Sequence, residues 1–308
     1  MIYDNGALRP EKIVAEKWMR LIYDDASGAN AAHEADALCG TQAPFAPSSL
    51  ARLTSRKILS RLYGAYCKTR HSANMIGKFI AENHVDMAGC PPAGSYKNFA
   101  EFFSREKKGI TFPKEPHLLG SPCEGLVSAY DDIDPARMVA AKGMEYSLAE
   151  LFGDAEMAEA YRGGSCLRVR LTPADYHRMH FFDHGEITAV ECIDGDLYSV
   201  NPLAVARIAK LYCQNKRVRI NISTRNFGDV VIMEVGATFV GSIVHRFLAG
   251  DNARRGWQAS YFLPGGSLVL VYFKKDAVKL DAEIIDRTKK GIETKTAVGT
   301  SVGESLTR

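Results

Sequence analysis

Three short stretches of the sequence carry residues that could do chemistry together. The first is Asp175-Tyr176-His177-Arg178-Met179-His180, which places two histidines three positions apart after a predicted strand. Histidine titrates near neutral pH, so His177 and His180 are candidate general acids or bases. As a bare pattern, two histidines at this spacing are more often structural. They could also be metal ligands, but zinc needs three or four, and we predict no metal site because no third ligand of matching spacing lies nearby.

The second stretch is Ser121-Pro122-Cys123-Glu124-Gly125, which places a carboxylate in a turn before a predicted strand. A carboxylate can orient a histidine and stabilise the protonated ring. Taken alone, this pattern is typical of a turn with a solvated acid. Glu124 is therefore a candidate partner for a histidine that the fold brings beside it.

The third stretch is Pro264-Gly265-Gly266-Ser267, directly before the apolar run Leu268–Phe273. Pro-Gly-Gly predicts a turn, where a serine is usually only a polar turn residue. A serine that follows glycine has a second use, because its hydroxyl can attack the preceding carbonyl in an N→O acyl shift. Glycine tolerates the strained backbone of such an attack, and a nearby histidine–carboxylate pair would supply the base.

The elements that precede these stretches are predominantly helical. Apolar residues recur at helical spacing in Glu11–Tyr23 and again in Leu50–Asn83, and a short helical piece covers Asn98–Lys107. Basic residues lie between the leucines of residues 50–78. Such a segment can lie on an anionic membrane surface, or it can pack on its own domain with a solvated basic face.

The elements that follow are mainly strands. Leu167, Val169 and Leu171 alternate with Arg168 and Arg170, which predicts a half-buried strand. The stretch 218–222 alternates in the same way, while 230–243 and 267–273 read as more deeply buried strands, and 201–213 as a short helix. We therefore predict an α+β fold, with a helical N-terminal region (1–110) packed on a larger β-rich domain (111–308) that carries the Gly-Ser turn.

Composition excludes several other classes of protein. The 308 residues are 46% hydrophobic and 24% charged, with a net charge of +3, so we expect a folded protein that binds no nucleic acid. No apolar run approaches the about 20 residues of a membrane span, and the N-terminus lacks the features of a signal peptide. The seven cysteines are scattered without CxxC pairs, which favours a reducing compartment, and we predict a cytoplasmic protein.

Taken in order along the chain, these motifs and several others resemble the phosphatidylserine decarboxylase family, in particular its soluble bacterial-type members. The stretches Asp175–His180 and 197–202 (Leu-Tyr-Ser-Val-Asn-Pro) are together highly specific. The remaining matches are Leu62-Tyr63-Gly64, Asp86-Met87, Phe102-Phe103-Ser104-Arg105, Ser121–Gly125, Lys142-Gly143, Tyr146-Ser147-Leu148, Glu234-Val235-Gly236-Ala237, Val240-Gly241-Ser242-Ile243 and Gly265-Gly266-Ser267.

The resemblance implies a pyruvoyl-dependent enzyme that is made from an inactive precursor. Ser267 would attack the carbonyl of Gly266, and the chain would split there. The pyruvoyl group would then form covalently from Ser267 at the head of a small subunit, 267–308, with no metal and no pyridoxal phosphate. His180 matches the self-cleavage histidine of the family, Glu124 stands where its partner aspartate usually does, and His177 matches the histidine of the decarboxylation.

The resemblance also implies the substrate and the partners. Phosphatidylserine would be converted to phosphatidylethanolamine and CO₂ by a homodimer bound peripherally to the cytoplasmic side of an anionic membrane. Three differences from the family pattern cluster near the cleavage point: Glu124, Leu268 in place of threonine, and the basic segment 252–263 with Trp257. They keep two alternatives open, a decarboxylase of a soluble amino acid, for example an aromatic one, and an uncleaved homologue without activity.

Overall fold

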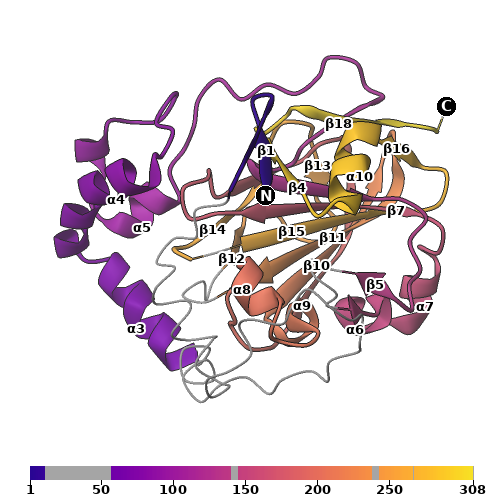
Figure 1. The fold of residues 1–308 in the computed structure, drawn as a ribbon, viewed down its shortest axis with the longest axis horizontal. Helices are drawn as coiled ribbons and strands as arrows, with labels where there is room; N and C mark the ends of the chain where they lie inside the picture. Colours follow the sequence, from indigo (N-terminus) through magenta and orange to yellow (C-terminus); the bar gives the residue numbers. More distant parts are fainter. Residues whose placement is uncertain (11–56, 140–144, 238–242, 266, 308) are drawn as a thin grey trace.

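The computed structural model describes residues 1–10, 57–139, 145–237, 243–265 and 267–307 (Figure 1). In these residues the centre of the fold is one large sheet. All of its neighbouring strands run antiparallel except β1 and β17. The order across the sheet is β13 (Asn252–Ala253), β9 (Gly185–Ile193), β10 (Arg217–Thr224), β11 (Gly228–Gly236), β15 (Ser267–Phe273), β7 (Ser165–Leu171), β4 (Gly125–Tyr130), β17 (Glu293–Thr296), β1 (Ile2–Asp4) and β2 (Ala7–Arg9).

Strand β15 lies in the middle of this sheet, between β11 and β7, and all of its residues are buried. It consists almost entirely of aliphatic and aromatic residues, which favour strands that are covered on both faces. Val269, Val271 and Phe273 join the core on one face of the sheet, and Leu268 and Leu270 join the core on the other. The predicted small subunit therefore begins with a strand that is buried along its whole length.

Three smaller sheets and short helices complete the β-rich part. The strands are β12 (Ile243–His245), β14 (Gln258–Phe262) and β8 (Arg178–His180) in one sheet, β16 (Val278–Leu280), β18 (Ser301–Ser305) and β3 (Leu118–Gly120) in the second, and β5 (Met138–Val139) and β6 (Glu145–Tyr146) in the third. The helices are α6 (Leu148–Phe152), α7 (Ala155–Glu159), α8 (Pro202–Val205), α9 (Leu211–Gln214) and α10 (Ala282–Lys289).

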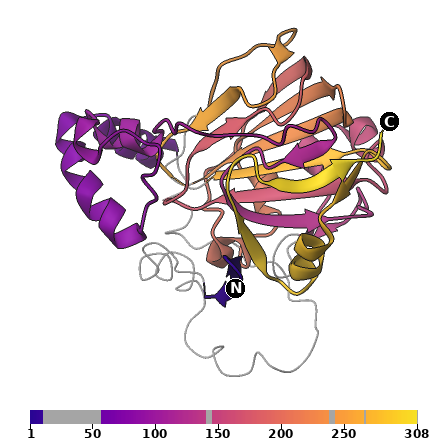
Figure 2. The same ribbon diagram turned by 90° about the horizontal axis from the view of Figure 1, so that it is seen from above.

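The remaining helices stand together at one side of the large sheet (Figures 1 and 2). Their own apolar core is built largely from aromatic side chains, including Phe99, Phe102 and Phe103. Arg178 of β8 donates to the carbonyl of Ser104 at 2.8 Å, which ties this group of helices to the β-rich part. The helices are α3 (Lys57–Cys67), η1 (Arg70–Met75), α4 (Ile76–Asn83), η2 (Ala93–Ser95) and α5 (Phe99–Phe103).

The α+β class is confirmed, whereas several local predictions need correction. The stretch 201–213 is not one helix, because Lys210 adopts a left-handed conformation (φ +49°) and separates α8 from α9. β7 is not half-buried, since Arg168 and Arg170 are also enclosed. The boundary at residue 110 stays a prediction, although β1 and β2 belong to the large sheet. The helix predicted for Glu11–Tyr23 lies outside the described residues.

Candidate active site

Ser267 lies at the first position of β15, inside the sheet rather than on a loop. It is fully buried and stands between Gly236 of β11 and Leu171 of β7. Gly265, two residues earlier, has φ +146°, a conformation that side-chain-bearing residues rarely adopt. Gly266 itself is outside the described residues. The Ser267 hydroxyl oxygen lies 3.5 Å from Nδ1 of His177, so the structure brings these two candidates together.

The ring of His177 is held from its other nitrogen and from one face. Nε2 lies 2.9 Å from the carbonyl oxygen of Thr172, which accepts only if Nε2 carries the proton. That tautomer leaves the lone pair of Nδ1 facing Ser267. Phe103 stacks on the ring with 4.0 Å between the centroids. Complete burial lowers the pKa of His177 to about 3, so the ring is neutral near pH 7.

His180, three residues after His177, contacts other groups. Its Nδ1 lies 2.9 Å from the carbonyl oxygen of Gly256, and its Nε2 lies 3.1 Å from the hydroxyl of Tyr176. Burial lowers its pKa as well. Both nitrogens are thus engaged away from Ser267 and Glu124. The role predicted for His180 in self-cleavage stays a prediction, and it requires the ring to leave these partners.

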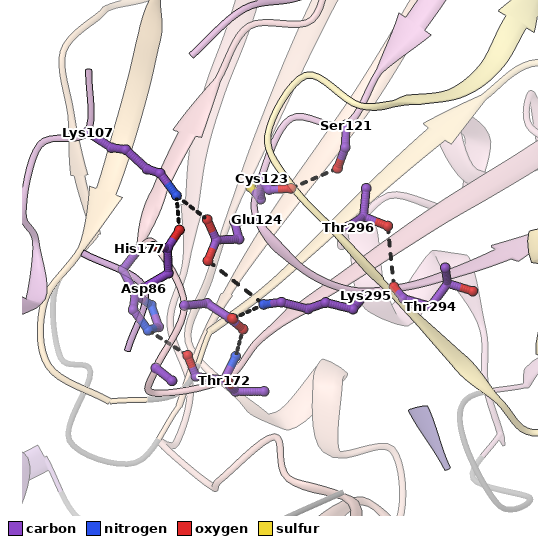
Figure 3. Close-up of polar contacts among 12 residues, drawn as sticks. Asp86, Lys107, Ser121, Cys123, Glu124, Thr172, His177, Thr294, Lys295 and Thr296 are labelled. Atoms are coloured by element: carbon purple, nitrogen blue, oxygen red, sulfur yellow. Dashed lines mark hydrogen bonds and ion pairs between the residues drawn. The ribbon is translucent and has the colours of Figure 1, made fainter. Parts of the chain in front are cut away.

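Glu124 is buried and turns toward two lysines rather than toward a histidine (Figure 3). Its carboxylate lies 3.4 Å from Nζ of Lys107 and 3.8 Å from Nζ of Lys295. Lys107 also donates to Asp86 at 2.8 Å, and this hydrogen bond lowers the pKa of Asp86. Glu124 is therefore part of an ion-pair network with these two lysines.

Asp175 and Lys295 belong to the site, although sequence reasoning gave neither of them a role. Asp175 is buried and forms an ion pair with Lys295. Its Oδ2 accepts the N–H of Thr172 at 2.6 Å, and its own N–H donates to the Thr172 carbonyl at 2.9 Å. The sequence does contain a signal for Asp175, because this residue begins the Asp-Tyr-His motif. Lys295 gave none, because only the fold brings it from 120 residues away.

Two observations on the described residues concern metal binding and membrane spanning. Among the described residues, no group of three or more histidine, cysteine or acidic side chains is placed to hold a metal ion. None of the helices in the described ranges is long and apolar enough to cross a membrane. The matching stretches Lys142-Gly143 and Val240-Gly241-Ser242 lie outside these ranges.

Ser267 is thus a buried serine that begins a strand, follows two glycines in the sequence and lies 3.5 Å from a histidine nitrogen. This is the class of site that an N→O acyl shift would use. The comparisons then identify the family. A family model for phosphatidylserine decarboxylase matches residues 96–304. The chain is 36% identical over 299 residues to a phosphatidylserine decarboxylase proenzyme of Clostridium novyi, covering 96% of this chain and 95% of that protein.

Two further relatives have the same name. The protein of Ruminiclostridium cellulolyticum is 41% identical over 257 residues, which cover 82% of this chain and 86% of the relative. A protein of Clostridium perfringens is 39% identical over 265 residues, which cover 84% and 90%. The chain belongs to the phosphatidylserine decarboxylase family, as its ordered motifs predicted.

Proposed function

We propose that this protein cleaves itself between Gly266 and Ser267 and then decarboxylates phosphatidylserine to phosphatidylethanolamine. The observation that carries the proposal is the contact of 3.5 Å between the Ser267 hydroxyl and His177 at the head of the buried strand β15. Membership of a family whose relatives are named proenzymes supports the same reaction. The reaction class is that of a carboxy-lyase.

Maturation consists of three balanced steps. The Ser267 oxygen attacks the carbonyl carbon of Gly266, the peptide C–N bond breaks, and an ester joins the two residues. Loss of the Cα proton of residue 267 then breaks its Cβ–O bond and releases Gly266 as a carboxylate. The dehydroalanine that remains takes up water and releases ammonia, which leaves a pyruvoyl group. The apolar cores on both sides of β15 retain the new chain end where it was formed.

The two histidines divide the work in this proposal. His177 accepts the hydrogen bond of the Ser267 hydroxyl and fixes its direction, but a ring with a pKa of about 3 is a weak base. We therefore assign proton removal during self-cleavage to His180, after it exchanges its contacts with Gly256 and Tyr176. After maturation, His177 is the ring beside residue 267. We assign it proton delivery to the product carbon: its Nδ1 lone pair first takes up a proton from water and then passes that proton on, which returns the ring to the neutral Nε2–H form.

The residues present fit a pyruvoyl group, because its atoms come from Ser267 and Gly236 opposite has no side chain to obstruct it. When formed, the group supplies a ketone that condenses with the substrate amine and accepts the electrons left by CO₂. The chain supplies the rest: His177 holds a proton at Nδ1 or accepts one there, and Phe103 excludes water from one face of that ring.

We also propose that the enzyme works as a homodimer on an anionic membrane surface. Helix α3 supports membrane contact, since Leu62 and Tyr66 are exposed to solvent and Lys57 begins the helix. Basic residues next to an anionic bilayer each contribute about 1 kcal/mol. Pelleting with phosphatidylserine-containing vesicles, but not with purely zwitterionic ones, is the expected result. A Leu62→Ser, Tyr66→Ser variant should pellet less.

The decisive test is the intact mass of the denatured protein beside Ser267→Ala. Two fragments that meet at 266/267, with the small one blocked at its N-terminus, are expected for the wild type and a single chain for the variant. CO₂ release from phosphatidylserine vesicles should follow the cleaved fraction. A wild type that stays uncut, like Ser267→Ala, would refute the proposal and leave the uncleaved, non-catalytic homologue.

The same assay separates the two histidines. His180→Ala should block cleavage, whereas His177→Ala should still cleave slowly and yet release no CO₂ from the cleaved fraction. If His177→Ala alone blocks cleavage, the division of roles given above is wrong, and His177 serves both steps.

A further inference from the structure

Lys295 comes from the segment that becomes the small subunit, yet its partners lie on the other side of the cleavage point. It lies on β17, and its ammonium group forms an ion pair with the carboxylate of Asp175. The same group contacts the carboxylate of Glu124 (Figure 3). The Asp175 side chain is only 3% exposed, and burying a carboxylate is costly unless a cation lies close by. Lys295 is the lysine that supplies it, since Lys107 pairs with Asp86 and Glu124 instead.

Asp175 in turn shapes the turn that follows β7. Its Oδ2 accepts the N–H of Thr172 at 2.6 Å, while its backbone N–H donates to the Thr172 carbonyl at 2.9 Å. The side chain and the backbone thus close the same four-residue turn from both ends. With Asp175 held by Lys295, the carbonyl of Thr172 has a fixed direction.

That carbonyl is the group that orients His177. It accepts Nε2–H at 2.9 Å, and the opposite ring nitrogen then faces the Ser267 oxygen at 3.5 Å. A continuous path of contacts therefore runs from Lys295 through Asp175 and Thr172 to residue 267.

We propose that Lys295 is a positioning residue, which fixes the tautomer and direction of His177 toward residue 267 by holding the Thr172–Asp175 turn. This inference rests on the proposed function, because it concerns the step that His177 carries out. It adds that a residue of the small subunit completes the site of the large one. Both subunits are then needed for catalysis, beyond the pyruvoyl group itself.

The experiment compares Lys295→Met with Lys295→Arg, Lys107→Met and Lys279→Met. Lys279 lies in the same segment and is 66% exposed, so it controls for loss of a lysine. The rate on phosphatidylserine vesicles is expressed per cleaved, pyruvoyl-bearing chain, which removes differences in maturation. Since a misplacement of about 1 Å can cost about 100-fold, we expect kcat of Lys295→Met to fall about 10- to 100-fold with KM changed less than about twofold.

The conservative variant and the two controls test whether the effect is specific to the cation at position 295. Lys295→Arg keeps the cation and should recover most of kcat, while Lys279→Met should equal the wild type. Lys107 does not contact Asp175, so kcat should fall less in Lys107→Met than in Lys295→Met. Asp175→Asn should make the further loss of Lys295 nearly silent, because both changes interrupt one path.

A spectroscopic readout separates positioning from general damage. The ¹⁵N shifts of the His177 ring report which nitrogen carries the proton, and Ser267→Ala protein suits this measurement because it stays one chain. The Nε2–H form is expected with Lys295 and a mixture of tautomers in the Lys295→Met form.

Three results would overturn the inference: an unchanged tautomer, a kcat within about twofold of the wild type, or additive effects with Asp175→Asn. If Lys295→Met fails to mature, the His177 tautomer measured in Ser267→Ala protein decides the inference. Failure of the proposed function is distinct, because the wild type itself would then remain uncut or inactive.

Discussion

Two charged residues on β17, two positions apart, both reach across to the other side of the cleavage point. Glu293 pairs with Arg168 and Arg170 of β7, whose side chains are only 5% and 7% exposed. Lys295 pairs with Asp175 and Glu124, and its own side chain is 31% exposed. One strand thus carries an anion that is 14% exposed among cations and a cation that is 31% exposed among anions.

The surroundings of the two clusters explain why they differ in use. Arg168 also donates to Ser128 and lies over the ring of Tyr130, so the Glu293 cluster is enclosed by protein. The Lys295 cluster borders a cavity of about 290 Å³, which Thr172 lines as well. Similar ion pairs therefore serve packing in one place and a reacting group in the other, depending on what lies beside them.

The largest effect on stability is expected for Glu293→Gln. The change removes the negative charge and leaves two buried guanidinium groups without it, and breaking a buried pair in this way costs about 3–5 kcal/mol. Urea unfolding of Ser267→Ala protein, which remains a single chain, measures it. Lys295→Met in the same background should lose less, about 1–3 kcal/mol, because Glu124 keeps Lys107 and Asp175 keeps the N–H of Thr172, although Asp175 loses its cation. Equal losses for the two variants would erase the distinction between the clusters.

Acid titration separates the two regions further. Burial lowers the pKa of His177 from 6.5 to about 3, so the unfolded chain binds a proton that the folded chain does not. Stability therefore falls as pH drops below about 6.5, by about 1–2 kcal/mol down to pH 5. Burial tends to raise the pKa of Glu293, but Arg170 and Arg168 bring it below 4.5, so its contribution is lost only at more acidic pH.

His177→Gln tests this assignment in Ser267→Ala protein. It should flatten the decline between pH 6.5 and 5, although His180, whose pKa burial also lowers, retains part of it. His117→Gln, at an exposed position, is the matched control for the loss of a histidine. An unaltered slope in His177→Gln would show that other groups cause the acid sensitivity.

How far the sequence predicts this molecule depends on how local the signal is. The apolar run after Ser267 indicates a buried strand by itself, and β15 is one. The alternation of Arg168 and Arg170 with apolar residues suggested a solvated face, because period-two patterning cannot reveal that Glu293 arrives from about 125 residues away. Burial of a charge is decided by its partner, and the partner is a matter of topology.

The same contrast between local and long-range signals holds for the candidate site. The motifs supplied Ser267, His177, His180 and Glu124, and the fold brings His177 to Ser267. Which of two histidines three positions apart faces the serine depends on the carbonyl of Thr172 and on the end of β8 at His180. Neither is visible in residue types, since backbone carbonyls have no sequence signature.

The smallest effect is expected for the pair of Lys279 and Glu304, which also joins two strands but lies in solvent. Their charged atoms are 3.3 Å apart, with side chains 66% and 46% exposed. Water screens such a pair and ordering two long side chains offsets its attraction, so a double-mutant cycle with Lys279→Met and Glu304→Gln should give a coupling of about 0–0.5 kcal/mol. Distance alone would rank this pair with Arg168 and Glu293, whose atoms are 3.2 Å apart. A coupling that matches the cost of Glu293→Gln would mean that proximity, rather than burial and neighbours, sets the worth of an ion pair in this fold.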